Sequence, residues 1–253
     1  MDNEPRTIEA VRFTCNIIDY LNEEGEAGIT EIAKEFDRSK SSVHAYLTTL
    51  AEESFVVKED KRYSLGLHHL ELAEGAKNQI SDFDLIESEI DSLAEKTGEV
   101  AQFGMQEEDD LVYLYKAYGD SAVETMSSIG SRGTLHSTAL GKAILSRMDE
   151  SSVRDVLGRE PFPSNTSNTI TDYESLFAEL RRTRERGFAI DDEENVMGLI
   201  CIAAPVVLDD GTILGALSVS GPSSRLSHER IENELENEVT SAANVIQINV
   251  TFS

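Results

Sequence analysis

The sequence is poor in basic residues, and above all in lysine. Its 253 residues include 48 acidic and 22 basic side chains, of which 8 are Lys, and the formal net charge is -26. The acidic residues are spread along the chain and do not form a tail. Because an acidic, lysine-poor surface keeps a protein soluble in concentrated salt, we expect a halophilic source. An acidic protein from ordinary salt is the alternative.

Cysteines and long apolar runs are also scarce. Cys15 and Cys201 are far apart and each lies among apolar residues, which favours reduced, buried thiols over a disulfide framework. The longest apolar run, residues 197–208, has 12 residues, far fewer than the roughly 20 of a membrane helix. The N-terminal MDNEPRTIEA has no signal pattern. We therefore expect a cytoplasmic protein without a membrane segment.

What the sequence does contain begins with three helical segments. In residues 7–24 apolar side chains recur at steps of three and four, the pattern of an amphipathic helix; they are Ile8, Val11, Cys15 and Ile18. ITEIAKEF, with Thr30 as N-cap, predicts a short second helix. SKSSVHAYLTTLAEE, with Ser39 as N-cap, predicts a third. Its buried stripe consists of Val43, Leu47 and Leu50.

A wing and a linker follow these helices. FVVKEDKRYSLG predicts two short strands around the polar tip KEDKR. Residues 1–66 therefore predict a winged helix-turn-helix domain. Residues 67–80, with Leu67, Leu70 and Leu72, continue as a helix that links this domain to the rest of the chain.

The third helix presents a small, polar face opposite its buried stripe. Residues 38–51 contain two basic residues and no acid, and residues 1–66 carry a net charge of -6 against -20 for the remainder. Such a face can enter a DNA major groove. The predicted DNA contacts are Arg38, Ser39, Lys40, Ser41, Ser42 and His44, with Lys61 and Arg62 of the wing. A winged helix used only for protein contact is the alternative.

Residues 81–253 mix helices with paired strands. FDLIESEIDSLAEKTG predicts a helix that ends at Gly98. TDYESLFAELRRTRERG predicts another, with a capping box of Thr171 and Glu174 and a terminal Gly187. Two hairpins are expected, VAQFGM with LVYLYKAY and GLICIAAPVVL with ILGALSVSGP. The pattern predicts an α+β fold.

The stretch LHSTALGKAIL, residues 135–145, combines a His, a Ser and a Gly-Lys pair. It lacks the glycine-rich turn of a phosphate loop and the elbow of a serine hydrolase. Its small residues instead predict a helix N-terminus whose free backbone N–H groups approach a carboxylate; they are Ser137, Thr138, Ala139 and Gly141. We expect His136 to position the turn and Lys142 to be a solvated charge.

The chain as a whole resembles the IclR family of transcriptional regulators. The resemblance rests on the order and spacing of ITEIAKEF, SKSSVHAYLTTL, YSLG, IGSRGTLHSTALGKAIL, RGFAIDDEEN, CIAAPV and GALSVSGP. It implies a winged helix that binds double-stranded operator DNA, a dimerising linker helix, and a GAF-like domain, residues 81–253, that binds a small organic acid or aromatic effector. Members are homodimers or tetramers. The resemblance implies no catalytic residue, metal or cofactor.

The family motifs also imply an effector site. Carried over residue by residue, it comprises Ala139, Leu140, Asp191, Cys201, Ser218 and Ser220. Backbone amides and serine hydroxyls can bind a carboxylate, and Asp191 can accept from a hydroxyl. An enzyme centred on Cys201 and Asp191 is the alternative.

Two positions depart from the family pattern. Ala45 follows His44, where members often have Arg, so one contact with DNA is missing. Leu140 is bulkier than the small residue expected at the pocket mouth. We therefore do not predict which effector binds.

Overall fold

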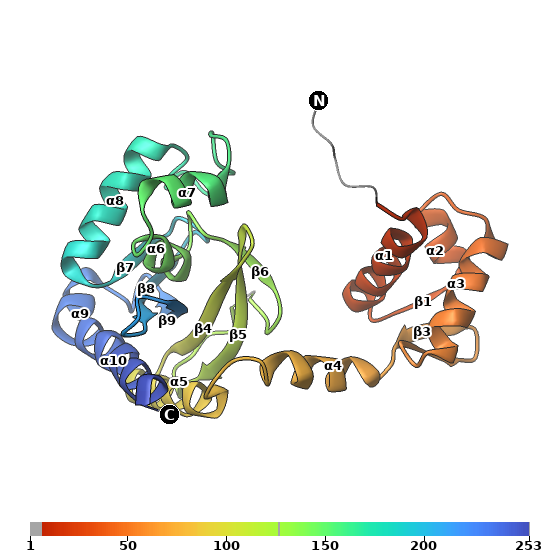
Figure 1. Ribbon diagram of the computed structural model, residues 1–253, viewed down its shortest axis with the longest axis horizontal. Coiled ribbons are helices and arrows are strands. Elements are labelled where there is room, and N and C mark those ends of the chain that lie inside the picture. Colours follow the sequence, from red (N-terminus) through yellow and green to blue (C-terminus); the bar gives the residue numbers. More distant parts are fainter. Residues whose placement is uncertain (1–6, 126, 253) are drawn as a thin grey trace. The chain divides into compact units, whose positions relative to one another are not determined.

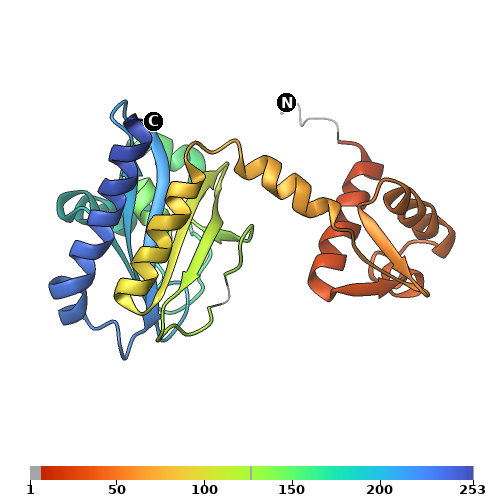
Figure 2. The ribbon, with the colours of Figure 1, turned by 90° about the horizontal axis from the view of Figure 1, so that it is seen from below.

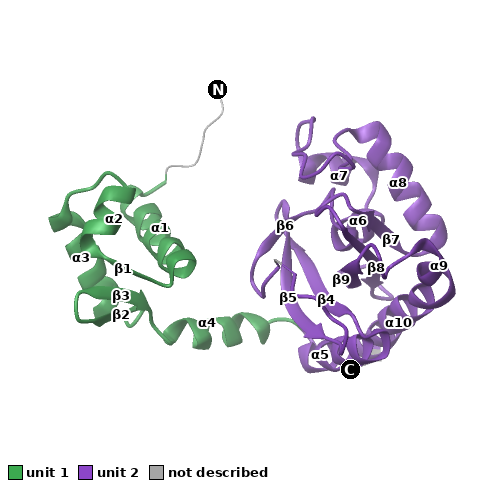
Figure 3. Cartoon of the chain, turned by 180° about the vertical axis from the view of Figure 1, so that it is seen from behind, with its two compact units in different colours: residues 1–80 green, residues 81–253 purple. Residues whose placement is uncertain are grey.

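A computed structural model describes residues 7–125 and 127–252 of the chain. It forms two compact units, residues 1–80 and 81–253 (Figure 3). The first contains a three-stranded sheet and the second a six-stranded sheet. None of the described helices is long and apolar enough to cross a membrane.

The first unit consists of helices followed by a hairpin and a further helix. Its sheet has the order β1-β3-β2 with antiparallel pairing. The elements are α1 (Glu9–Glu24), β1 (Glu26–Gly28), α2 (Ile29–Glu35), α3 (Lys40–Glu52), β2 (Val56–Glu59), β3 (Arg62–Leu65) and α4 (His68–Lys77). The predicted wing is thus the β2–β3 hairpin. The segment expected to be only a turn after α1 contains the short strand β1.

The core of the first unit lies between α1, α2, α3 and the small sheet. Val43, Leu47 and Leu50 of α3 are buried, as the sequence predicts. The prediction for α1 was wrong about its face, because this helix carries two apolar stripes. The stripe that packs into the core is Phe13, Ile17 and Leu21. Ile8, Val11 and Cys15 are exposed, which also corrects the expectation of a buried Cys15 thiol.

Of the two N-cap residues predicted in this unit, one is confirmed and one is wrong. Ser39 caps α3, since its hydroxyl accepts a hydrogen bond from Ser42 N at 3.1 Å. The predicted N-cap Thr30 is wrong, because α2 starts earlier and its N-cap is Gly28. Glu31 Oε2 accepts from Gly28 N at 2.8 Å and holds that turn.

The second unit is built on an antiparallel sheet of order β6-β5-β4-β9-β8-β7 (Figure 1). Both predicted hairpins are present, β4 with β5 and β8 with β9. The strands are β4 (Val100–Glu107), β5 (Asp110–Tyr118), β6 (Arg132–Thr134), β7 (Ala189–Asp192), β8 (Leu199–Val207) and β9 (Ile213–Pro222).

Helices cover both faces of this sheet. Figure 2 shows α5 and α10 side by side on one face, while α6, α7 and α8 lie on the other. The helices are α5 (Phe83–Thr97), α6 (Ala139–Leu145), α7 (Glu150–Leu157), α8 (Tyr173–Arg186), α9 (His228–Arg230) and α10 (Glu236–Phe252). A π-helical turn, Ile231–Leu235, joins α9 to α10. The predicted α+β class is confirmed.

Helix ends in the second unit follow the sequence signals in part. Gly98 and Gly187 end α5 and α8 in the left-handed conformation, as predicted. The capping box at Thr171 is wrong by one residue. Asp172 is the N-cap of α8, and its Oδ1 accepts from Ser175 N at 2.8 Å.

Candidate functional site

Two rows of side chains cross the sheet on the face that α6 covers. Asp191 of β7 pairs with Cys201 of β8, and Cys201 pairs with Ser220 of β9. Ser218, two residues before Ser220, pairs with Gln102 of β4. Because side chains alternate along a strand, these residues project from the same face. Antiparallel register therefore brings together groups from four strands.

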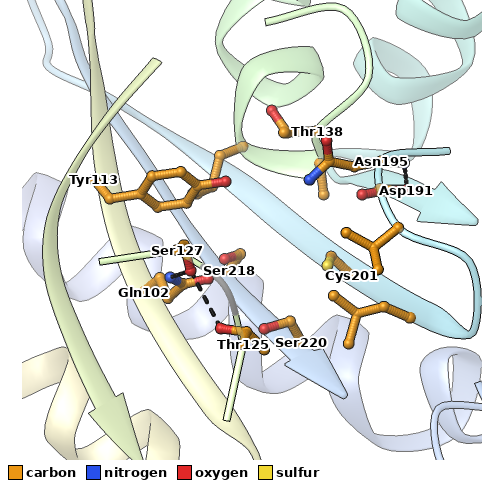
Figure 4. A pocket seen from close by; sticks show the side chains of 14 residues that line it. Gln102, Tyr113, Thr125, Ser127, Thr138, Asp191, Asn195, Cys201, Ser218 and Ser220 are labelled. Carbon is orange, nitrogen blue, oxygen red and sulfur yellow. Dashed lines mark hydrogen bonds between the residues drawn. The ribbon is translucent and has the colours of Figure 1, made fainter. Parts of the chain in front are cut away.

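A cavity of about 60 Å³ lies over these rows (Figure 4). Since a buried water needs roughly 10–15 Å³ of such volume, the cavity holds a few atoms of a small ligand. All six residues of the predicted effector site line it, namely Ala139, Leu140, Asp191, Cys201, Ser218 and Ser220. Thr138, expected at the helix N-terminus beside the ligand, lines it as well, and seven further lining residues were not predicted, namely Gln102, Tyr113, Thr125, Ser127, Asn195, Val196 and Leu199.

One of the missed residues had a sequence signal. Gln102 is a polar side chain inside the otherwise apolar strand segment VAQFGM, and it is 5% exposed. Its Nε2 donates to Ser127 Oγ at 2.7 Å, which draws the loop after β5 to the cavity. Ser127 and Asn195 lie in loops where no periodicity marks their direction.

Asp191 is the acidic group of the cavity, and it is 2% exposed. Its Oδ1 accepts from Glu194 N at 2.7 Å and from Asn195 N at 3.2 Å. Burial raises the pKa of Asp191 to about 7, although the nearby Lys142 ammonium and these two amides act in the opposite direction. The carboxyl group therefore titrates near neutral pH.

Lys142 contradicts the expectation of a solvated charge. Its side chain is fully buried, and its Nζ forms an ion pair with Glu194 Oε1. A buried ammonium needs such a partner because burial without one is very costly. The Gly-Lys pair of LHSTALGKAIL thus joins α6 to the loop after β7.

The N-terminus of α6 has fewer free amides than the sequence predicts. Thr138 Oγ1 accepts from Gly141 N at 3.1 Å. In the described part of the chain, the N–H groups of Ala139 and Leu140 have no hydrogen-bond partner. A Cβ at Gly141 would lie 2.3 Å from Leu135 O. Gly141 is therefore required for packing against the preceding turn, which corrects its expected role beside a ligand.

His136 lies beneath this turn and is 3% exposed. Its Nε2 lies 2.9 Å from Pro163 O, and its ring is tilted against that of Phe162. Burial lowers the pKa of His136. Its contacts are those of a residue that positions the turn.

Unused hydrogen-bonding capacity also faces the cavity. Ser220 is 1% exposed, and its Oγ, which lies beside the Cys201 thiol, has no oxygen or nitrogen hydrogen-bond partner among the described residues. Such buried hydroxyls are normally satisfied. A polar ligand would supply the missing partner.

Cys201, the centre of the enzyme alternative, is partly buried beside Asp191 and Ser220. Burial, together with the neighbouring Asp191, raises the pKa of the Cys201 thiol. Because the thiolate is the reactive form, these surroundings do not activate it. Among the described residues, no group of three His, Cys, Asp or Glu side chains could hold a metal ion.

The candidate DNA-binding surface lies on the first unit. The predicted contacts on α3 and before it, Arg38, Ser39, Lys40, Ser41 and His44, are exposed, and Ser42 is partly buried. At the wing, Lys61 is exposed at the tip of the β2–β3 turn and Arg62 begins β3. The structure thus presents the predicted residues on α3 and the wing.

Two of the predicted basic residues are already paired within the unit. Arg38 Nη2 lies 2.5 Å from Glu9 Oε1. Arg62 contacts Glu26 Oε1 at 2.7 Å and Glu31 Oε1 at 3.1 Å. Lys40 and Lys61, by contrast, have no acidic partner in the described residues. Of the four basic residues predicted to contact DNA, these two lysines are the ones that are free for a phosphate.

Models of known families match both units. The "IclR helix-turn-helix domain" matches residues 14–60, and "Bacterial transcriptional regulator IclR C-terminal" matches residues 79–248. The second match alone covers more than half of the chain.

Individual relatives agree with this assignment. The chain is 35% identical over 237 residues to the HTH-type transcriptional regulator KdgR of Escherichia coli, covering 92% of this chain and 89% of KdgR. It is 30% identical to ArcR of Halobacterium salinarum over 251 residues, 98% and 95% of the two chains. The crystal structure of the Thermotoga maritima IclR superposes with a TM-score of 0.82 at 28% identity, over 97% of this chain and 100% of that one.

The relatives are named as regulators, which favours a regulator over the enzyme alternative. The helix-turn-helix unit and the second unit each match the corresponding part of one family. The chain belongs to the IclR family of DNA-binding transcriptional regulators, with a C-terminal effector-binding domain.

Proposed function

We propose that the cavity over β7, β8, β9 and β4 binds a small organic acid, and that its occupancy changes how the winged helices fit operator DNA. The observation that carries the proposal is that the Ser220 hydroxyl and Ala139 and Leu140, whose backbone amides are free, line one cavity. A ligand carboxylate accepts from such donors. A ligand that binds one conformation better shifts the equilibrium toward it.

The size and lining of the cavity favour an acid over an aromatic compound. Its volume of about 60 Å³ and its hydroxyl and amide groups suit a ligand of few atoms with several polar groups. The lining contains no Lys or Arg. Neutral donors would therefore bind the carboxylate, and protonation of Asp191 would remove the repulsion between two negative charges.

We also propose a homodimer, or a tetramer built from dimers, formed through the linker helix. Leu67 and Leu70 are 80% and 64% exposed, and Leu72 is 46% exposed. Exposed apolar side chains of this size support a contact with a second chain. The variant L67E/L70E should lower the mass measured by light scattering, and an unchanged mass would contradict this contact.

The domain division that accompanies this function is a winged helix in residues 1–66, a linker in residues 67–80 and a GAF-like effector domain in residues 81–253. The antiparallel sheet with helices on both faces supports the GAF-like description. The net charge of -26 and the relative from Halobacterium salinarum support a halophilic, haloarchaeal-type regulator. We propose that it acts in the cytoplasm.

A ligand screen by thermal shift in concentrated salt tests the effector site, because a ligand that binds the folded state raises its stability. The double variant S218A/S220A should lose the shift. The control S241A changes an exposed serine of α10, outside the cavity, and should keep it. A shift that persists in S218A/S220A would mean that the pocket is elsewhere.

Two further measurements separate the alternatives. If the ligand is converted to a product by the full chain, the enzyme alternative is supported and the regulator with a passive pocket is not. Footprinting of the gene's own upstream DNA tests operator binding. No protection at any salt concentration would leave only a winged helix that contacts proteins.

A further inference from the structure

A loop without regular structure, residues 164–169, holds the segment that follows β7. Three successive carbonyls, that of the last residue of β7 and those of the two residues after it, each accept a hydrogen bond from a side chain of the loop. Asn168 Nδ2 donates to Asp192 O at 3.3 Å. Thr166 Oγ1 donates to Glu193 O at 2.7 Å, and Thr169 Oγ1 donates to Glu194 O at 2.6 Å. The backbone of residues 192–194 is therefore fixed by side chains about 25 positions earlier in the chain.

The next residue, Asn195, is partly buried and lines the cavity. Its Oδ1 accepts from Asn165 Nδ2 at 2.9 Å. Its Nδ2 donates to no residue in the described chain. In Figure 4 this nitrogen lies on the side of Asn195 that faces Tyr113. The free end of the amide is thus its donor end.

Asn165 presents its Nδ2 to the oxygen of that amide. Its Nδ2 also donates to Ser137 Oγ at 3.3 Å, so its two N–H groups serve Asn195 and Ser137. An amide that already uses its oxygen can offer a ligand only N–H groups. The hydroxyls of Tyr113, Ser218 and Ser220 can each donate or accept, and they do not discriminate in this way.

We propose that Asn195 is a specificity-determining residue of the effector cavity, oriented by Asn165 so that it donates a hydrogen bond to a carbonyl or carboxylate oxygen of the effector. The inference rests on the proposed acid-binding function and adds the polarity of one subsite. An ammonium or N–H group at that position would face a donor. Sites that hydrogen-bond their ligand discriminate strongly against analogues that cannot make the bond.

The test uses two probe series with matched carbon skeletons, the 2-oxo acids and the 2-amino acids with three to six carbons. Calorimetric titration of the full chain gives the affinity for each acid. We expect the best 2-oxo acid to bind about tenfold or more tightly than the 2-amino acid of the same length, which corresponds to one hydrogen bond.

Three variants distinguish an effect of the orientation of the Asn195 amide from a general effect on folding. N195D has nearly the same shape but offers an acceptor, so it should weaken the 2-oxo acid about tenfold or more and reduce or reverse the preference. The carboxylate of N165D can only accept hydrogen bonds, so Asn195 should turn its Nδ2 toward residue 165 and its Oδ1 toward the cavity. The preference for the 2-oxo acid over the 2-amino acid should therefore fall, as in N195D. N244D adds the same charge on α10 at an exposed position outside the cavity and should leave both affinities unchanged.

The ratio of the two affinities is the decisive readout, because a general structural defect weakens both acids alike. Equal weakening of both series in N195D and N165D would overturn the inference. Equal binding of both series by the wild-type chain would overturn it as well. Failure of the wild-type chain to bind any of these acids would overturn the acid-binding function itself, and the inference with it.

Discussion

The buried ammonium of Lys142, on α6, forms an ion pair with the carboxylate of Glu194, on the loop that follows β7. Lys142 is fully buried, and the side chain of Glu194 is 9% exposed. Glu194 N in turn donates to Asp191 Oδ1 at 2.7 Å. The pair therefore connects the helix and the strand end that border the cavity.

Removal of one partner of this pair should be strongly destabilising. E194Q leaves the buried Lys142 charge without its ion-pair partner, so we expect a loss of about 3–5 kcal/mol in the free energy of unfolding. The double variant K142M/E194Q removes both charges and should lose less than E194Q alone. Chemical denaturation of both variants measures the difference.

The control for this prediction is the exposed ion pair of Lys96 and Glu238. The distance from Lys96 Nζ to Glu238 Oε2 is 3.9 Å, and the two side chains are 58% and 38% exposed. E238Q should change the free energy of unfolding by less than about 1 kcal/mol. If E194Q loses no more than E238Q, the buried pair does not stabilise the cavity wall.

Asp191 should make stability depend on pH near neutrality. Its pKa is raised from 3.8 to about 7 in the folded chain, so between these values only the folded state holds the proton. The Asp191 contribution to stability is therefore fully present below about pH 4, falls progressively as the pH rises, and is lost once the pH has passed about 7. In this range the free energy of unfolding of the wild-type chain should fall by up to about 1.4 kcal/mol per pH unit. D191N should lack this decrease, and chemical denaturation of both chains at several pH values measures it.

The same proton should affect ligand binding. An anionic acid in the cavity disfavours ionised Asp191, so binding should take up a proton and tighten as the pH falls toward about 6. Titration in buffers of different ionisation enthalpy detects the proton. A pH-independent affinity that is the same in D191N would contradict this coupling.

Gly141 should not tolerate a methyl group. A Cβ there would lie 2.3 Å from Leu135 O and 2.4 Å from Leu135 Cα, so G141A should cost about 1–3 kcal/mol or more. Gly75, in α4, has no atom within 4 Å of its Cβ position, and G75A should be neutral or stabilising by up to about 1 kcal/mol. Equal stability of the two variants would show that the turn before α6 moves freely.

Substitution of the basic residues of the first unit should have two different effects, a loss of DNA affinity or a loss of stability. K40Q and K61Q should each weaken binding to upstream DNA and reduce the slope of log affinity against log salt by about one. R62Q should instead lower the stability of the wing, because Arg62 pairs with Glu26 and Glu31. Fluorescence anisotropy over a range of salt concentrations, with thermal melting of each variant, distinguishes these effects. A full change in slope for R62Q at unchanged stability would mean that Arg62 leaves its acidic partners to contact DNA.

Local sequence signals were sufficient for most elements of the fold. The stripe of Val43, Leu47 and Leu50, the Ser39 cap and the two hairpins depend on neighbours within a few residues. Periodicity was not sufficient for α1, because two apolar stripes share that helix and only packing selects Phe13, Ile17 and Leu21. The α+β class follows from local patterns because each element buries one face.

The cavity shows the same division between sequence and tertiary structure. The resemblance to the IclR family, and no local pattern, predicted that Asp191, Cys201 and the two serines share one site, and strand register aligns them. By contrast, Lys142 and Glu194 are 52 positions apart, and Asn165 and Asn195 are 30 apart. A side chain's charge or amide is visible in the sequence, but its partner is chosen by chain segments that meet only after folding. The sequence thus determined which groups are available, and only the tertiary structure decided that Lys142 is buried and which end of Asn195 is free.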